Sequence, residues 1–245
     1  MTWTKNEIII MPLALIITIF LAIFICKITK NKDEKIKFIP LQIISITMVV
    51  LEIIKQILSF ENGKYKTWST PLHFCSMFMF IFVLASFSKG TLKKFGLALS
   101  NAFSAIFFAL FYVSPSGIIG NACDNIFANF FTFHTFIYHH LIILFFLIMI
   151  ISKLYIPQIK DFSYVSIGLT TYIAIALPMA HILNVNFCTI LYSNIPIMEN
   201  IRLSLGQIPY TLILSCLGYF GLNAIVGISL IVKKWAEHKY QLQII

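Results

Sequence analysis

Charged residues are scarce in this sequence of 245 residues. Aspartate, glutamate, lysine and arginine together make up 11% of the chain, whereas 59% is hydrophobic and 15% is aromatic. Soluble globular proteins carry about 25% charged residues. The composition therefore excludes an ordinary soluble enzyme. It predicts an all-α polytopic membrane protein with a single integral membrane domain over residues 1–245.

The common metal-binding spacings are also missing. The sequence has no HExxH pattern and no CxxC pattern, and it holds only nine acidic residues. These spacings are typical of catalytic and structural zinc sites. Several histidines are expected at one membrane face, so metal binding stays open as a second chemical option. The sequence identifies no metal and no cofactor.

Long apolar runs are what the sequence does contain. Each can cross a bilayer as a helix, the one open-chain element whose backbone polar groups are satisfied in lipid. The pattern predicts a bundle of seven transmembrane helices, the first of which is retained because it lacks a small-residue cleavage site. The runs are Ile8–Cys26, Ile39–Phe60, Pro71–Phe87, Phe95–Val113, Phe131–Ile151, Tyr164–Leu183 and Pro209–Val232.

Lysine and arginine are distributed unequally between the two sides of these helices. Most of the 18 basic residues fall in the first, third and fifth loops and in the C-terminal tail. Basic loops stay in the cytoplasm, so we expect a multi-pass cell-membrane protein with the N-terminus outside and the C-terminus in the cytoplasm. The formal charge of +9 then indicates contact with anionic membrane lipids, and we expect no nucleic-acid partner.

Polar residues inside the apolar runs collect at the extracytoplasmic ends in this topology. Ionisable residues within a membrane helix are costly, so such a cluster predicts a functional site. The alternative is that serine and histidine form structural hydrogen bonds between helices. The candidate substrate-binding residues are His134, His140, His181, Asn184 and Tyr210.

The stretch from Pro71 to Ser76 supplies the candidate catalytic residues. Histidine can activate a thiol or a hydroxyl as a nucleophile, so we expect His73 and His139 as acid/base residues with Cys75 or Ser76 as nucleophile. On a regular helix His73 shares a face with Ser76, whereas Cys75 points away from His73. A pair drawn from two helices, such as Cys75 with His139, is geometrically easier.

Glu52 and Lys55 are three residues apart inside the second apolar run. Residues at this spacing lie on one helix face and can form an ion pair. We interpret them as a structural ion pair within the bundle rather than as a proton relay.

Several motifs, taken in order along the chain, resemble the YwaF family of bacterial integral membrane proteins. They are Pro71-Leu72-His73-Phe74-Cys75-Ser76, Ser114-Pro115-Ser116, His134 with His139, Asn186-Phe187, and Leu205-Gly206-Gln207-Ile208-Pro209-Tyr210. That family is similar to a eukaryotic group of TMEM-type proteins linked to acyl transfer onto ether phospholipids. The resemblance implies an enzyme that uses histidine and cysteine. The cysteine of the eukaryotic motif immediately precedes its histidine, a position that Leu72 occupies here.

Two functional hypotheses follow. The first is a lipid-modifying membrane enzyme that transfers or hydrolyses phospholipid acyl chains at the extracytoplasmic face. The alternative is a non-catalytic protein that binds or transports a small molecule or a lipid in an outward-facing polar cavity. Polarity concentrated at one end, rather than along a path through the membrane, favours the enzyme.

Overall fold

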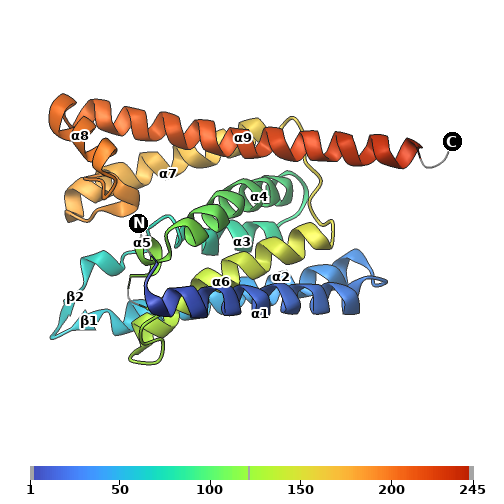
Figure 1. The fold of residues 1–245 in the computed structure, drawn as a ribbon, viewed down its shortest axis with the longest axis horizontal. Coiled ribbons are helices and arrows are strands. Elements are labelled where there is room, and N and C mark those ends of the chain that lie inside the picture. Colours follow the sequence, from blue (N-terminus) through green and yellow to red (C-terminus); the bar gives the residue numbers. More distant parts are fainter. Residues whose placement is uncertain (1–2, 121, 243–245) are drawn as a thin grey trace. The chain divides into compact units, whose positions relative to one another are not determined.

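The computed structural model describes residues 3–120 and 122–242, and these residues are almost entirely helical (Figure 1). Six helices are long and apolar enough to cross a membrane. They are α1 (Lys5–Thr29), α2 (Glu34–Leu58), α4 (Gly90–Val113), α6 (Phe130–Ile151), α7 (Asp161–Leu183) and α9 (Gln207–Leu242). A seventh apolar helix, α3 (Met77–Phe87), is shorter. The predicted all-α polytopic membrane fold is confirmed.

Shorter elements lie in the connections. They are the strands β1 (Phe60–Glu61) and β2 (Lys64–Tyr65), the helices α5 (Pro115–Ile119) and α8 (Pro196–Leu205), and 3₁₀ turns at Thr67–Ser69 and Phe187–Thr189. The two strands form an antiparallel hairpin whose turn holds Asn62 and Gly63, both at positive φ. An Asn-Gly pair favours this turn because both residues tolerate a left-handed backbone.

The chain divides into two compact units. The first comprises Met1–Ser69 and Cys75–Ile156, and the second comprises Thr70–Phe74 and Pro157–Ile245. The expectation of one domain over the whole chain stays a prediction. The boundary falls inside the stretch that carries the candidate catalytic residues, so His73 belongs to the second unit and Cys75 to the first.

Helices α1, α2, α3, α4 and α6 pack together in the first unit. Its core is aromatic: the rings of Phe82 and Phe145 stack with centroids 3.7 Å apart. Helices α3 and α4 approach closely at Gly96, where an added Cβ atom would lie 2.5 Å from the backbone nitrogen of Ala85. Only glycine leaves room for the α3 backbone at that position.

The third apolar run differs from its prediction. Residues 71–76 form turns, and helix α3 begins only at Met77 and is 11 residues long. At 1.5 Å per residue it covers about 16 Å, roughly half the hydrocarbon thickness. The hydroxyl of Tyr172 donates to the backbone oxygen of Leu72 over 3.0 Å, which occupies a carbonyl that a regular helix would use. The comparison of helix faces within Pro71–Ser76 therefore does not apply.

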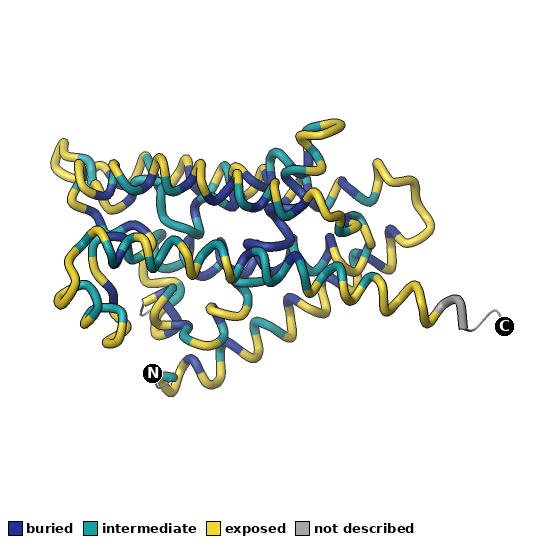
Figure 2. The backbone as a smooth tube through the Cα atoms, turned by 90° about the horizontal axis from the view of Figure 1, so that it is seen from above, coloured by how far each residue is buried: buried dark blue, intermediate teal, exposed yellow. Residues whose placement is uncertain are grey.

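Helices α7, α8 and α9 make up most of the second unit, and α7 runs beside α9 in Figure 1. Helix α9 has 36 residues. Its length of about 54 Å exceeds the roughly 30 Å of hydrocarbon in a bilayer. Residues 234–239, near its end, are exposed (Figure 2). One end of α9 must therefore extend into the headgroup region or beyond it.

Candidate functional site

The first unit contains a buried ion pair on α2. The ammonium Nζ of Lys55 lies 2.8 Å from Oε1 of Glu52, and the two side chains are 10% and 3% exposed. The predicted pairing of these residues on one helix face is confirmed. A pair buried to this degree is held only by good geometry and additional hydrogen bonds.

Gln56 and the β-hairpin supply such hydrogen bonds. The amide Nε2 of Gln56 donates to Oε1 of Glu52 over 2.5 Å and to the backbone oxygen of Ser69 over 2.7 Å. The hydroxyl of Tyr65, at the end of β2, donates to the side-chain oxygen of Gln56. The hairpin thus orients Gln56, and Gln56 in turn orients the carboxylate.

His134, in the first turns of α6, reaches the other oxygen of this carboxylate. Its Nε2 atom lies 3.7 Å from Oε2 of Glu52, and both side chains are buried. Neither atom has a hydrogen-bond partner among the described protein atoms. The carboxylate is therefore bonded on one side and faces an imidazole on the other.

Three further residues of α6 extend the polar cluster. The Nδ1 atoms of His139 and His140 lie 2.5 Å from the carbonyl of Thr135 and 2.8 Å from that of Phe136. A carbonyl only accepts, so each Nδ1 carries the proton and each Nε2 is left as an acceptor. Both Nε2 atoms are buried without a partner among the described atoms, and the buried hydroxyl of Tyr138 makes only a poorly aligned contact with the backbone of Met79.

Aromatic rings hold these histidines in place. The ring of Tyr138 stacks on His134 with centroids 5.0 Å apart. Phe107 and Phe111 of α4 stack on His139 at 5.4 and 5.6 Å. The apolar contacts hold the imidazoles in one orientation, while their Nε2 atoms lack a bonding partner.

Cys75 and Ser76 lie at the entrance to α3 in the same unit. The thiol of Cys75 is within electrostatic range of Lys55, Glu52 and Tyr138. Ser76 is 3% exposed, and its side chain hydrogen-bonds to Cys75. We call Glu52, Lys55, Cys75, His134 and Tyr138 the acid–base cluster. No group of three histidine, cysteine or acidic side chains in the described part of the chain could hold a metal ion.

The candidate residues of the second unit have other surroundings. The ring of His73 meets the edge of Phe187 with centroids 5.1 Å apart. His181 is exposed near the end of α7. Asn184 is exposed as well and caps α7 in the left-handed conformation, at a φ of 51°. A left-handed asparagine commonly ends a helix.

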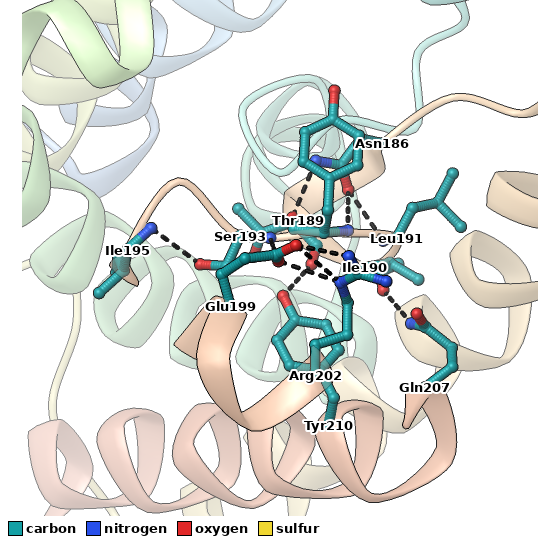
Figure 3. Close-up of polar contacts among 11 residues, drawn as sticks. Asn186, Thr189, Ile190, Leu191, Ser193, Ile195, Glu199, Arg202, Gln207 and Tyr210 are labelled. Atoms are coloured by element: carbon teal, nitrogen blue, oxygen red, sulfur yellow. Dashed lines mark hydrogen bonds and ion pairs between the residues drawn. The ribbon is translucent and has the colours of Figure 1, made fainter. Parts of the chain in front are cut away.

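Tyr210, the remaining candidate, is bound to the loop that precedes α8 (Figure 3). Its side chain is fully buried, and its hydroxyl donates to the backbone oxygen of Thr189. Gln207 donates to the oxygen of Ile190 over 2.7 Å, and Oδ1 of Asn186 accepts from the amide of Leu191 over 2.8 Å. These polar groups satisfy the backbone of an irregular loop.

Comparison with known families supplies the relationship. The model of the TMEM164 family matches residues 1–226. The chain belongs to the TMEM164 family. No curated protein and no solved structure matched the sequence.

Membership of the TMEM164 family confirms the TMEM-type part of the resemblance and, with the six long apolar helices, shows a multi-pass membrane protein embedded in lipid. The matched range includes the whole acid–base cluster. Of the acid–base cluster, sequence reasoning selected Cys75 and His134 as candidate site residues. It interpreted Glu52 and Lys55 as a structural ion pair and assigned no role to Tyr138. The signal for Tyr138 was the one that marks His134, a polar side chain inside an apolar run.

Proposed function

We propose that this TMEM164-family protein is a lipid-modifying membrane enzyme that transfers or hydrolyses phospholipid acyl chains. The supporting observation is the acid–base cluster, in which a thiol, an imidazole and a buried ion pair belong to one compact unit. The resemblance to proteins linked to ether-phospholipid acylation points to the same class of substrate. The positive-inside pattern assigns the reaction to the extracytoplasmic face.

Cys75 is the proposed nucleophile. Its thiol lies within electrostatic range of both Lys55 and Glu52, and a buried thiol becomes a nucleophile only when a neighbouring base takes its proton. Ser76, buried beside it, is the alternative nucleophile. Attack on an acyl ester by either residue would break the ester C–O bond, release a lysophospholipid whose alkoxide takes a proton from a histidine, and leave an acyl-enzyme. Water or the hydroxyl of a second lysophospholipid would then take the acyl group and return the thiol or hydroxyl to the free enzyme.

His134 and His139 are the proposed acid/base residues of this unit. Glu52 faces Nε2 of His134 at 3.7 Å, and a carboxylate next to an imidazole stabilises the cation that forms when the ring takes a proton. His139 and His140 present unprotonated Nε2 atoms, which can accept a hydrogen bond from a substrate hydroxyl or ammonium group. In the second unit, His73 is proposed as a further acid/base residue, with His181, Asn184 and Tyr210 as substrate-binding residues.

Ligand binding without chemistry is the second candidate. It is favoured by the number of buried polar atoms in the first unit that lack a partner, because such atoms can hold a polar solute or lipid headgroup. This candidate needs the same residues but no bond cleavage. The two functions therefore differ in the fate of the ligand.

Purified protein in lipid nanodiscs, incubated with phospholipid labelled in one acyl chain, tests the proposal. The wild type should release or transfer the label, and Cys75→Ala or His134→Ala should lower the rate about 100-fold or more. Cys216→Ala and His238→Ala are matched controls, because both side chains are exposed and lie outside the cluster. Ser76→Ala separates the two candidate nucleophiles.

Two results would contradict the enzyme. One is the absence of any release or transfer by the wild type, and bound but unchanged lipid would then support the binding function. The other is full activity in both the His73→Ala and His139→Ala variants. A hydroxylamine-sensitive acyl group on the wild type that Cys75→Ala abolishes would identify the thioester.

A further inference from the structure

The second unit contains a cavity of about 680 Å³. The segments that line it are separated along the chain from the candidate site residues of this unit. It lies between the segment that leads into α7 and the last third of α9. Ile159, Leu230 and Ile231 form its apolar wall. Lys160, Lys233 and Lys234 supply positive charge, and Glu237 is the one acidic side chain in its lining.

The position of this cavity along α9 matches the edge of the hydrocarbon layer. The apolar part of α9 ends at Val232, and Lys233 and Lys234 follow directly. Trp235 is 66% exposed, and Nζ of Lys239 lies 5.5 Å from the centre of its ring. Tryptophan and lysine mark the boundary between hydrocarbon and headgroups in membrane helices. The apolar wall then faces acyl chains, and the lysines lie at headgroup level.

One hydrogen bond holds the two sides of the cavity together. The ammonium of Lys233 donates to the backbone oxygen of Pro157 over 3.3 Å. Lys160 and Lys234 are exposed, and both lie in the lining. Ile159 and Ile231, beside them, are 79% and 69% exposed, which makes an apolar surface next to a basic one.

We propose that this cavity binds an anionic phospholipid, with the phosphate against Lys160 and Lys234 and an acyl chain along Ile159 and Ile231. The three lysines outnumber the single glutamate, so the lining complements a headgroup that carries net negative charge. Basic pockets at the ends of membrane helices bind such headgroups. A free phosphate would leave the apolar wall in water, and a zwitterionic lipid would gain less from the lysines. The binding is independent of the proposed enzymatic activity.

The experiment measures lipid binding to the full-length protein by native mass spectrometry from detergent. The probes are phosphatidylglycerol, phosphatidylcholine of the same acyl chains, and inorganic phosphate. The wild type should retain phosphatidylglycerol in preference to phosphatidylcholine. The triple variant K160Q/K233Q/K234Q should weaken phosphatidylglycerol binding by about 100-fold, given roughly fivefold for each lysine near a membrane surface.

A second triple variant, K27Q/K30Q/K32Q, is the matched control. It removes the same three charges from exposed positions at and after the end of α1, so a general attraction to anionic lipid would fall by the same amount. The proposal requires that this control bind as the wild type does. Glu237→Gln should tighten phosphatidylglycerol binding, because it removes the one negative charge of the lining.

Three outcomes would overturn the proposal. Equal loss in the two triple variants would mean general surface attraction rather than a site. Equal retention of phosphatidylcholine and phosphatidylglycerol would remove the role of charge. Displacement of the bound lipid by millimolar inorganic phosphate would indicate a phosphate site without a lipid component.

Discussion

The two units differ in whether their polar side chains have hydrogen-bond partners. In the second unit, Gln207, Tyr210 and Asn186 all bond to backbone groups of the loop before α8 (Figure 3). In the first unit, the Nε2 atoms of His134, His139 and His140 are buried without partners among the described atoms. Tyr210 and these histidines were predicted from sequence as one outward-facing set.

This difference bears on which residues form the proposed site. A buried polar group that is bonded to backbone stabilises a loop, and its role is then accounted for. A buried polar group without a protein partner costs free energy, so a ligand is one explanation for it. The comparison therefore favours the first unit as the location of the proposed site. Each of the following predictions tests it.

The largest expected effect follows from breaking the buried ion pair. Glu52→Leu leaves the ammonium of Lys55 buried without a counter-charge, so we expect the free energy of unfolding to fall by about 3–5 kcal/mol. Denaturant unfolding of the purified protein in detergent, followed by circular dichroism, measures this change.

Two controls accompany that variant. The double variant E52L/K55L should recover most of the loss, because no unpaired charge then remains. Glu199→Leu, which breaks the partly exposed pair with Arg202 in the second unit, should lower the free energy of unfolding far less, because solvent screens that pair. An equal loss of unfolding free energy in Glu52→Leu and Glu199→Leu would show that breaking the buried ion pair of the first unit costs no more than breaking the other pair.

One cysteine in each unit allows the reactivity of a buried thiol to be compared with that of an exposed one. Cys123 of the first unit is 3% exposed, and burial, with Glu7 and Asp124 nearby, raises its pKa from 9.0 to about 11. Its thiolate fraction near neutral pH should then be about 100-fold below that of an unshifted thiol. Cys188 of the second unit is exposed.

A membrane-impermeant maleimide, applied to cells that express single-cysteine variants, measures this difference. Cys188 should react rapidly from outside, whereas Cys123 should react slowly, and faster as the pH rises toward 11. Equal rates for the two would contradict the burial of Cys123. Reaction of Cys188 from the cytoplasm alone would overturn the predicted orientation.

Helix packing gives a third contrast. Gly96→Ala should lower the free energy of unfolding by about 1–3 kcal/mol, because its Cβ atom would lie 2.5 Å from the backbone of Ala85. In the second unit nothing lies within 4 Å of a Cβ atom built on Gly227. Gly227→Ala should therefore raise the stability by up to about 1 kcal/mol through its helix propensity. Thermal unfolding of both variants measures these two changes in stability. A Gly96→Ala protein as stable as the wild type would refute the close approach of α3 and α4.

A pair of tyrosines tests the hydrogen-bond contrast directly. Tyr210→Phe removes the bond to Thr189 and should cost about 1 kcal/mol. Tyr138→Phe removes a buried hydroxyl whose contact with the backbone of Met79 is poorly aligned, so its loss of stability should be smaller than that of Tyr210→Phe. Unfolding free energies of the two variants are the measurement. A larger loss in Tyr138→Phe than in Tyr210→Phe would reverse the comparison.

The smallest effect concerns the partly exposed ion pair between Glu199 and Arg202 on α8. Hydrogen bonds from Arg202 and from the amide of Ser193 lower the pKa of Glu199 from 4.5 to about 2. Its contribution to the loop is therefore present above pH 4.5 and is lost as the pH falls from 4.5 through 2. A carbon-13 titration of the Glu199 carboxyl should show this low pKa in the wild type and a higher pKa in Arg202→Gln, which keeps only the hydrogen bond from Ser193. The same pKa in both proteins would exclude the pair as the cause.

Much of the fold could be predicted from sequence. The apolar runs located six long helices to within a few residues for most of their ends, and Glu52 with Lys55 paired as their spacing predicted. The third run was the exception, because Tyr172, 100 residues away, bonds to Leu72 and the chain turns until Met77. A contact of that sequence separation leaves no local signal.

The candidate site could be predicted only in part. Apolar surroundings marked His134, His139, His140 and Cys75 as polar residues in a hydrophobic segment. Nothing near His134 in the sequence indicates Glu52, which lies on another helix 82 positions earlier. The partner of an imidazole is set by which helix faces pack together.

The sequence by itself determined that this is a helical membrane protein, because lipid offers no hydrogen bonds to the backbone and each long apolar run must satisfy its own. Tertiary structure decided the rest. Packing of α2 against α6 placed a carboxylate beside a histidine, and the loop before α8 took up the polar groups of Gln207, Tyr210 and Asn186. Hydropathy is a property of consecutive residues and can be read from the sequence. The partner of a polar side chain depends on which residues the folded chain brings into contact.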